Sequence, residues 1–276
     1  NENIKKCNLN KDKTIIYDIE EKQINNLINT INNFGKIIDN NEPYDDFNIQ
    51  LRNPTHILKN HTSYIYCLIL MNDGRLVSGS VDNSIIVYNK ITYQPDLIIK
   101  EHNSWICHII QLSSGVLASC SDDKTIKLFK INGNKYEVLQ ILNYHSDRVS
   151  RIIELNNKIM VSSSLDSSII FYIKDNNEYK IDFKISTQCQ CFTIIQTKEN
   201  EICYSEVKNK KICFFGLLER KIKSSISNIS AYDGVRSNFI IINKELLIFF
   251  GNFQTFINFR KYKYDQIFNN KNDRFK

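Results

Sequence analysis

Short apolar runs separated by polar turns dominate the middle of this chain, and one such pattern occurs three times. Each copy has an apolar residue, several small residues, an Asp, two polar residues and an apolar run that ends in or beside an aromatic residue. The copies are LVSGSVDNSIIVYN from Leu76, LASCSDDKTIKLFK from Leu117 and MVSSSLDSSIIFYI from Met160. Apolar runs of this length between turn residues predict β-strands.

Further strands complete the unit that surrounds each copy. In the first unit a continuous apolar run, Ile65–Leu70, has the composition of a strand buried on both faces. Asn72-Asp73-Gly74 then predicts a hairpin turn, and Asp82-Asn83 predicts a second one. The unit therefore contains four predicted strands, at residues 65–70, 76–80, 85–88 and 97–99.

Two polar markers repeat with the same period as the strands. A His precedes the first strand of each unit and an Asp follows the second, at intervals of 41 and 43 residues: His61, His102 and His145, with Asp82, Asp123 and Asp166. A period in this range predicts a repeat architecture in which each unit is one small four-stranded sheet. Because repeated units bury their cores against each other, we expect residues 1–276 to form one domain.

The repeat is clear over residues 57–185 and weaker on both sides. Residues 1–19 predict a partial hairpin, since Asp12-Lys13-Thr14-Ile15 repeats residues 123–126 letter for letter. For residues 20–56 two interpretations remain open, a degenerate unit or a helical insertion. The first rests on the likeness of NNFGKII from Asn32 to MNDGRLV from Met71, and the second on apolar residues at helical spacing between Ile24 and Ile38.

Residues 186–260 keep the period but not the markers, because Gln188 and Asn209 stand where His and Asp are expected. We predict degenerate units there. Residues 261–276 are either a basic tail or an outer strand.

With these motifs in place, the chain resembles the WD40 family of β-propellers. The resemblance lies in His-x-x-x-[Ile/Val] and in Ser-x-Asp-x-[Ser/Thr]-Ile followed by an aromatic residue, each present three times. It implies an all-β fold, a WD40-type propeller of four-stranded antiparallel blades, with seven blades expected and six as the alternative.

The resemblance also implies a structural role for the markers. In the family a His, a strand Ser, the turn Asp and a strand Trp form a hydrogen-bonded chain within each blade. The corresponding residues are His61, Ser80 and Asp82, then His102, Ser121 and Asp123, then His145, Ser164 and Asp166. The Trp position holds Tyr88, Phe129 and Tyr172 instead, and Phe cannot donate a hydrogen bond. Since each His–Asp pair belongs to a different blade, we expect no catalytic or metal site from them.

Residues between each marker His and the next strand lie at the rim of such a propeller. Tyr64, Trp105 and Arg148 occupy equivalent positions there, and these three residue types are enriched in interface hot spots. Asp122 and Asp147 share the rim, and Tyr232 and Arg236 are the corresponding candidates in the last unit. We expect a non-enzymatic scaffold that binds a protein or peptide on the rim and central channel face, with no cofactor, metal or small-molecule substrate. The alternative for the aromatic residues is packing on neighbouring loops.

Charge suggests a different function for the C-terminal stretch. The chain carries 36 basic and 30 acidic residues, a net charge of +6 that is spread along the sequence. The densest basic stretch, residues 259–276, interleaves Phe and Tyr with cations. Its basic residues are Arg260, Lys261, Lys263, Lys271, Arg274 and Lys276. Binding of nucleic acid or an anionic membrane through this stretch is the alternative function.

The eight cysteines occur mostly within predicted strands and form no CxxC pair. We therefore predict reduced core cysteines in an intracellular protein. No signal peptide and no 18-residue apolar run is present, so we expect the cytoplasm, with the nucleus as the alternative. Because the sequence begins with Asn1 rather than Met, we also expect it to be a segment of a longer protein.

Overall fold

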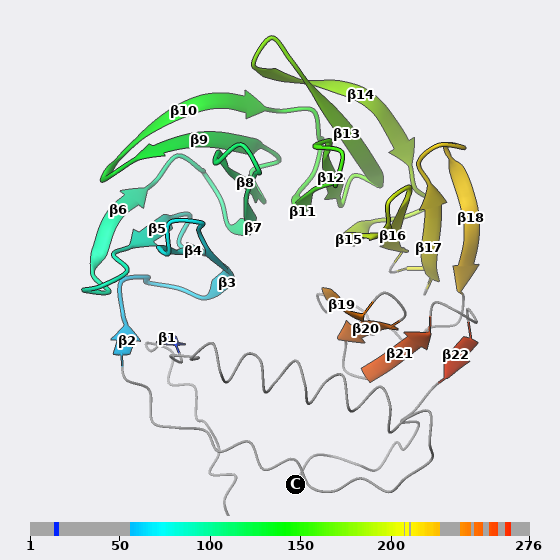
Figure 1. Cartoon of the computed structure of the whole chain (residues 1–276), viewed down its shortest axis with the longest axis horizontal. Coiled ribbons are helices and arrows are strands. Elements are labelled where there is room, and N and C mark those ends of the chain that lie inside the picture. Colours follow the sequence, from blue (N-terminus) through cyan, green and yellow to red (C-terminus); the bar gives the residue numbers. More distant parts are fainter. Residues whose placement is uncertain are drawn as a thin grey trace, which may run out of the picture.

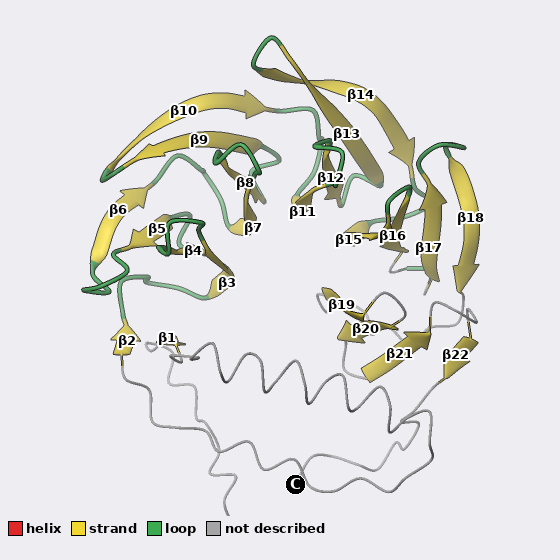
Figure 2. Cartoon of the chain, in the orientation of Figure 1, coloured by secondary structure: helices red, strands yellow, loops and turns green. Residues whose placement is uncertain are grey.

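All regular elements in the described part of the computed structural model are β-strands (Figure 2). The structure describes residues 14–16, 56–206, 208–209, 211–226, 238–243, 246–250, 254–258 and 263–265. Within these residues, no helix is long and apolar enough to cross a membrane. The strands form five four-stranded antiparallel sheets and one two-stranded sheet.

Each four-stranded sheet, which we call a blade, uses strands that are consecutive in the chain. Blade one contains β3 (Ile65–Leu70), β4 (Leu76–Ser80), β5 (Ile85–Tyr88) and β6 (Pro95–Ile99). Blade two contains β7 (Ile106–Gln111), β8 (Leu117–Ser121), β9 (Ile126–Asn132) and β10 (Lys135–Leu142). Blade three contains β11 (Val149–Glu154), β12 (Met160–Ser164), β13 (Ser168–Asp175) and β14 (Glu178–Ser186).

The region of weak markers forms two further blades. Blade four contains β15 (Cys191–Lys198), β16 (Glu201–Glu206), β17 (Lys211–Gly216) and β18 (Lys221–Ile226). Blade five contains β19 (Asn238–Asn243), β20 (Leu246–Phe250), β21 (Gln254–Asn258) and β22 (Lys263–Asp265). Residues 263–265 of the predicted basic tail are thus the outermost strand of this sheet.

The blades follow one another around an arc, with the first strand of each blade innermost and the fourth outermost (Figure 1). The innermost strands β3, β7, β11, β15 and β19 are successive neighbours. This arrangement confirms the predicted all-β class and the antiparallel four-stranded blades. The predicted total of seven blades, or six, involves residues outside the described part.

The two-stranded sheet pairs β1 (Thr14–Ile16) with β2 (His56–Leu58). Strand β2 ends three residues before His61, just as β6 ends before His102 and β10 before His145. It therefore has the position of an outermost strand. The described partner of β1 is this distant strand, and the rest of the predicted 1–19 hairpin lies outside the described residues. The same holds for residues 20–55, for which a degenerate unit or a helix was expected.

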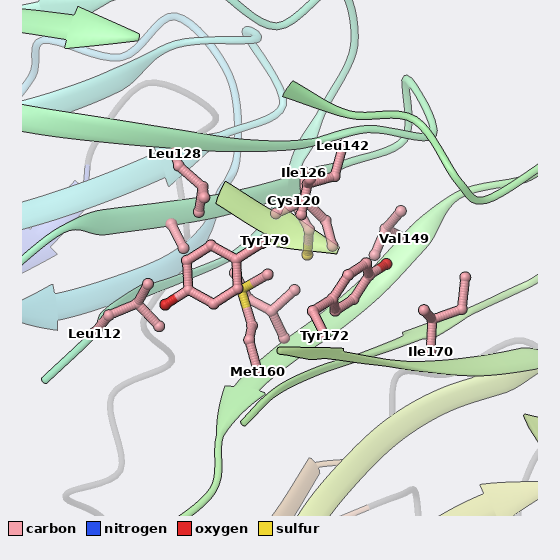
Figure 3. Close-up of a cluster of buried hydrophobic side chains, with 12 residues drawn as sticks. Leu112, Cys120, Ile126, Leu128, Leu142, Val149, Met160, Ile170, Tyr172 and Tyr179 are labelled. Carbon is pink, nitrogen blue, oxygen red and sulfur yellow. The ribbon is translucent and has the colours of Figure 1, made fainter. Parts of the chain in front are cut away.

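The hydrophobic core lies between blades rather than within them. In blades one to four, side chains on both faces of the second and third strands are buried, which explains why these strands have almost no alternation of apolar and polar residues. The outermost strands β10 and β14 alternate, because one of their faces is exposed. Between blades two and three, for example, Leu128 packs with Met160 and Tyr172 (Figure 3). Equivalent clusters join blade one to blade two and blade three to blade four.

Turn geometry keeps the strands in register. Gly74 and Gly115, in the turns between the first and second strands, have φ of +86° and +85°. The residue after each marker Asp also has positive φ, at 68° for Asn83, 73° for Lys124 and 62° for Ser167. A non-glycine residue in this region costs about 1 kcal/mol or more, so each turn needs a compensating interaction.

The face with the turns between first and second strands, which we call the lower face, carries contacts between neighbouring blades. The side-chain oxygen of Gln111 accepts the Asn72 N–H at 2.8 Å, and its amide donates to Gly115 O at 3.3 Å. At the equivalent position of blade three, Glu154 accepts both the N–H and the hydroxyl of Ser113, at 2.7 and 2.9 Å. These contacts hold the turns of adjacent blades together on the lower face.

Candidate functional site

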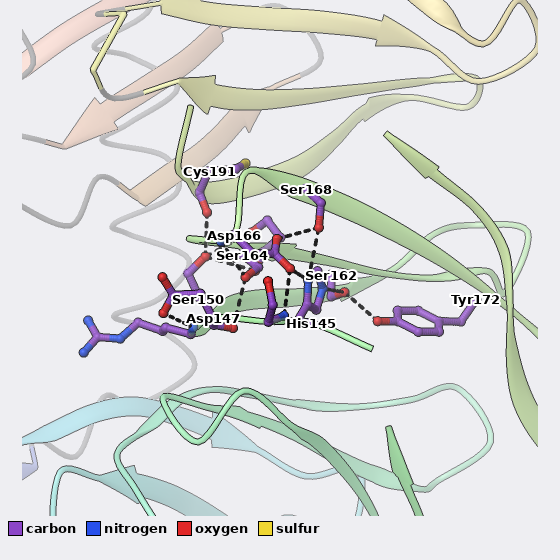
Figure 4. Close-up of polar contacts among 12 residues, drawn as sticks. His145, Asp147, Ser150, Ser162, Ser164, Asp166, Ser168, Tyr172 and Cys191 are labelled. Carbon is purple, nitrogen blue, oxygen red and sulfur yellow. Dashed lines mark hydrogen bonds and ion pairs between the residues drawn. The ribbon is translucent and has the colours of Figure 1, made fainter. Parts of the chain in front are cut away.

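A chain of four polar side chains runs through blade three (Figure 4). His145 Nδ1 lies 2.9 Å from Asp166 Oδ2, and its Nε2 lies 2.7 Å from Ser162 Oγ. Ser162 Oγ in turn lies 3.0 Å from the Tyr172 hydroxyl. An ionised Asp can only accept, so Nδ1 carries the proton and donates to Asp166, while Nε2 accepts from Ser162 and the tyrosine donates to Ser162.

Blades one and two repeat this arrangement. His61 lies 2.9 Å from Asp82 and 2.6 Å from Ser78, and His102 lies 2.8 Å from Asp123 and 2.7 Å from Ser119. The structure therefore brings together each His and Asp that were paired from the sequence, one pair in each blade.

The serine in the chain differs from the one expected. The His partners are Ser78, Ser119 and Ser162, two residues before the predicted Ser80, Ser121 and Ser164. Residues i and i+2 of a strand share a face. The imidazole points one nitrogen at the turn and the other at the deeper of the two serines.

The predicted serines instead tie the turn to the rim loop. Ser80 Oγ accepts the Asp82 N–H at 3.1 Å and donates to Tyr64 O at 2.9 Å. Ser121 and Ser164 likewise accept the N–H of the marker Asp, and they donate to the carbonyls of Ser104 and Asp147, one residue before the rim position, both at 3.1 Å. They fix the loop that carries the rim residues.

The aromatic end of the chain varies between blades as its residue types require. Tyr172 joins Ser162 in blade three, and Tyr88 hydrogen-bonds Ser78 in blade one. Phe129 is fully buried at the same position of blade two and has no hydroxyl to offer Ser119. The blade-two chain is one hydrogen bond shorter.

Hydrogen bonds hold the turn carboxylates in their ionised form. Burial alone would raise the pKa of Asp82, but hydrogen bonds from Ser84, Thr62 and His61 outweigh it and lower the pKa to about 2. The pKa of Asp166 is lowered for the same reasons. Burial lowers the pKa of His145 despite the neighbouring carboxylate. A charged Asp beside a neutral His serves to hold the turn in place rather than to carry out chemistry. The hydrogen bonds to the Asp offset the cost of the positive-φ residue in each turn.

Blade four has a different version of the same contacts. Asn209 Nδ2 lies 3.2 Å from Gln188 Oε1, the two positions that correspond to Asp and His. The buried Glu206, at the position of the predicted serines, accepts from Gln188 N and Asn209 Nδ2 at 3.2 and 3.1 Å. Amide side chains thus replace the His–Asp pair, which explains why the markers disappear from the sequence while the blade persists.

The face with the marker His and Asp residues, which we call the upper face, also carries the predicted rim residues. The guanidinium of Arg148 lies over the Trp105 ring, 5.1 Å from its centroid, and its Nε forms an ion pair with Asp122 Oδ1. The Tyr66 ring meets the Trp105 ring edge-on at 6.0 Å between centroids. These four residues, the rim cluster, connect blades one, two and three.

The other predicted rim residues are not part of the rim cluster. Tyr64 is 66% exposed at the rim position of blade one, compared with 37% for Trp105. Asp147 is exposed, and its Oδ1 accepts the Arg148 N–H at 2.7 Å. Tyr232 and Arg236 lie outside the described residues.

Sequence reasoning missed Tyr66. The register of β3 against β4 shifts between Ile65 and Cys67, so Tyr66 sits in a β-bulge. The same shift occurs in blades two and three. The one feature of the sequence that could have indicated Tyr66 as a rim residue is an aromatic residue at this repeated position.

Cysteines and metal ligands give no second site in the described part. Its seven cysteines are free, and all but the partly exposed Cys107 are buried. Burial raises the pKa of Cys191 and Cys203, which makes these thiols poor nucleophiles. Among the described residues, no three His, Cys, Asp or Glu side chains are grouped so as to hold a metal ion.

Comparison with known proteins agrees with this geometry. The family model for the WD domain, G-beta repeat matches residues 52–89 and 94–130, which include the marker His and Asp of the first two units. A search of curated proteins found no match. The matched repeats, the four-stranded blades and the His–Asp contacts support a WD40-repeat family for this chain.

Proposed function

We propose that the chain is a non-enzymatic scaffold that holds a protein or peptide on its upper face. WD40 repeats generally mediate protein–protein interaction and are typically non-enzymatic. The observation that carries the proposal is the rim cluster, in which Trp105 and Arg148 are held against each other and against Asp122 across a blade boundary.

The rim cluster supports binding because it is already ordered. Ordering an aromatic or arginine side chain on binding costs about 0.5–1.5 kcal/mol each. The ring contact with Tyr66 and the ion pair with Asp122 have already restricted Trp105 and Arg148. Tyr64 adds exposed aromatic surface at the next blade.

The rim loops are also fixed by the backbone. The N–H groups of Val81, Asp122 and Leu165 donate to the carbonyls of Tyr64, Trp105 and Arg148 at 2.8, 2.9 and 3.0 Å. Each rim residue therefore has the same backbone support in its own blade. Three equivalent side chains on one face form an extended surface, which suits a peptide or a protein edge better than a small molecule.

The test is partner capture with a triple variant, Tyr64→Ala, Trp105→Ala and Arg148→Ala. Proteins recovered from a cell lysate with the unchanged chain should be lost with the triple variant. A matched control is the double variant Ile91→Ala and Leu218→Ala, which removes exposed apolar side chains far from the rim. Unchanged recovery by a triple variant with a native circular dichroism spectrum would show that the binding face lies elsewhere.

The alternative, nucleic-acid or anionic-membrane binding through residues 259–276, rests on the sequence. Its test is titration of a labelled oligonucleotide and of phosphatidylserine vesicles at rising salt. Affinity that falls steeply with salt and depends on Arg260 and Lys261 would support it.

A further inference from the structure

The upper rim is acidic although the chain as a whole is basic. We define the upper rim of blades one to three as residues 61–64, 81–84, 102–105, 122–125, 145–148 and 165–168. It contains five carboxylates and two cations, a formal charge of −3 with His neutral, whereas the chain carries +6. The charged residues are Asp82, Asp122, Asp123, Asp147 and Asp166, with Lys124 and Arg148.

Three carboxylates of the upper rim, those of the marker Asp residues, stay charged at neutral pH. Hydrogen bonds lower the pKa of Asp82, Asp123 and Asp166 below the usual range despite their burial. Their His partners do not cancel this charge in blade three, because burial lowers the pKa of His145 and keeps it neutral.

The two cations of the upper rim offset this charge only in part. Arg148 is already paired with Asp122. Asp147 is exposed, and its carboxylate accepts the N–H of Arg148. Beside these charges lie two partly exposed aromatic rings, Tyr64 and Trp105, whose faces attract cations.

We propose that the partner presents a basic segment, with Lys or Arg side chains, to the upper rim. The cationic groups contact Asp147, the ring of Tyr64 and the part of the Trp105 ring that Arg148 leaves uncovered, and the field of the buried carboxylates attracts them to the upper rim. This inference rests on the proposed function, because it names the chemistry of the partner for the same face. An acidic peptide or a nucleic acid would face the wrong charge there.

The experiment is selection from a displayed library of random short peptides on the unchanged chain and on a double variant, Trp105→Ala with Asp147→Lys. Peptides that depend on the rim should be enriched in Arg and Lys. Trp105-dependent peptides that are acidic or neutral would overturn this inference and leave the proposed function standing. If no peptide depends on Trp105, the proposed function fails as well.

A direct titration then measures the charge preference. A selected Arg-containing peptide should bind roughly tenfold more tightly than the same peptide with Glu in place of Arg. Asp147→Lys should weaken binding by roughly tenfold, because it reverses an exposed charge at the contact. The control is Asp175→Asn at the end of β13, which removes an exposed carboxylate far from the rim. An equal loss with Asp175→Asn, or no loss with Asp147→Lys, would contradict the proposal.

Discussion

Replacing His145 by Ala should destabilise the fold strongly, because the imidazole links Asp166 to Ser162 in the blade-three chain. The variant loses a charge-assisted hydrogen bond to Asp166, worth about 1.5–3 kcal/mol. It also leaves the buried Ser162 hydroxyl without its acceptor, at a further cost of about 1–3 kcal/mol. The expected loss is about 3–5 kcal/mol, a large part of the 5–15 kcal/mol that is typical for a domain.

Urea unfolding followed by circular dichroism measures this loss. Fluorescence of Trp105, the only tryptophan, reports separately on blade two, and coincident transitions would show that the blades unfold together. The matched control is Ser146→Ala, next to the histidine, which keeps the backbone N–H that donates to Asp166 at 3.0 Å. A loss below about 1 kcal/mol for His145→Ala would refute the reasoning.

Three other predictions concern the same fold. Tyr172→Phe should cost about 1 kcal/mol by removing one neutral hydrogen bond, measured by urea unfolding; no change would mean that the hydroxyl contact is not formed. Gly79→Ala should cost about 1–3 kcal/mol, since its Cβ would lie 2.5 Å from the Ile106 side chain; a thermal midpoint equal to that of the unchanged chain contradicts this. Stability should decrease as the pH is lowered, because His145 and Asp166 both have lowered pKa values in the folded chain. The unfolded chain therefore takes up more protons than the folded chain, first below about pH 6.5 and then below about pH 4. His145→Ala should reduce the first of these steps in a denaturation series across pH without abolishing it, because burial also lowers the pKa of His108, to about 3.

Much of the fold could be predicted from the sequence because the repeat supplies independent evidence for each strand. The predicted boundaries of the first three strands of unit one coincide with β3, β4 and β5. Continuous apolar runs could be read as buried strands because both faces of each blade are covered. The His–Asp pairing could also be anticipated, since two markers with one period must have equivalent positions.

The site was less predictable because its contacts depend on how far each side chain reaches along a strand and on which residues of the next blade lie beside it. Ser78 and Ser80 share a strand face, so only the reach of the imidazole decides which one it contacts. The rim cluster joins residues that are 26 apart, Arg148 and Asp122, across a blade boundary that no local pattern describes. Gln188 and Asn209 could be placed at the His and Asp positions of blade four, but their contact was not predicted because amide side chains replace the His–Asp pair there.

The division of the core between neighbouring blades has a consequence for cutting the chain. A single cleavage in the loop of residues 143–148 would separate the two halves of the cluster in which Leu128 meets Met160 and Tyr172. Each fragment would then carry one half of an apolar interface that only the other fragment complements. Two fragments divided at this loop should therefore associate when mixed, and a split reporter attached to the two new ends would detect the reassembled blades.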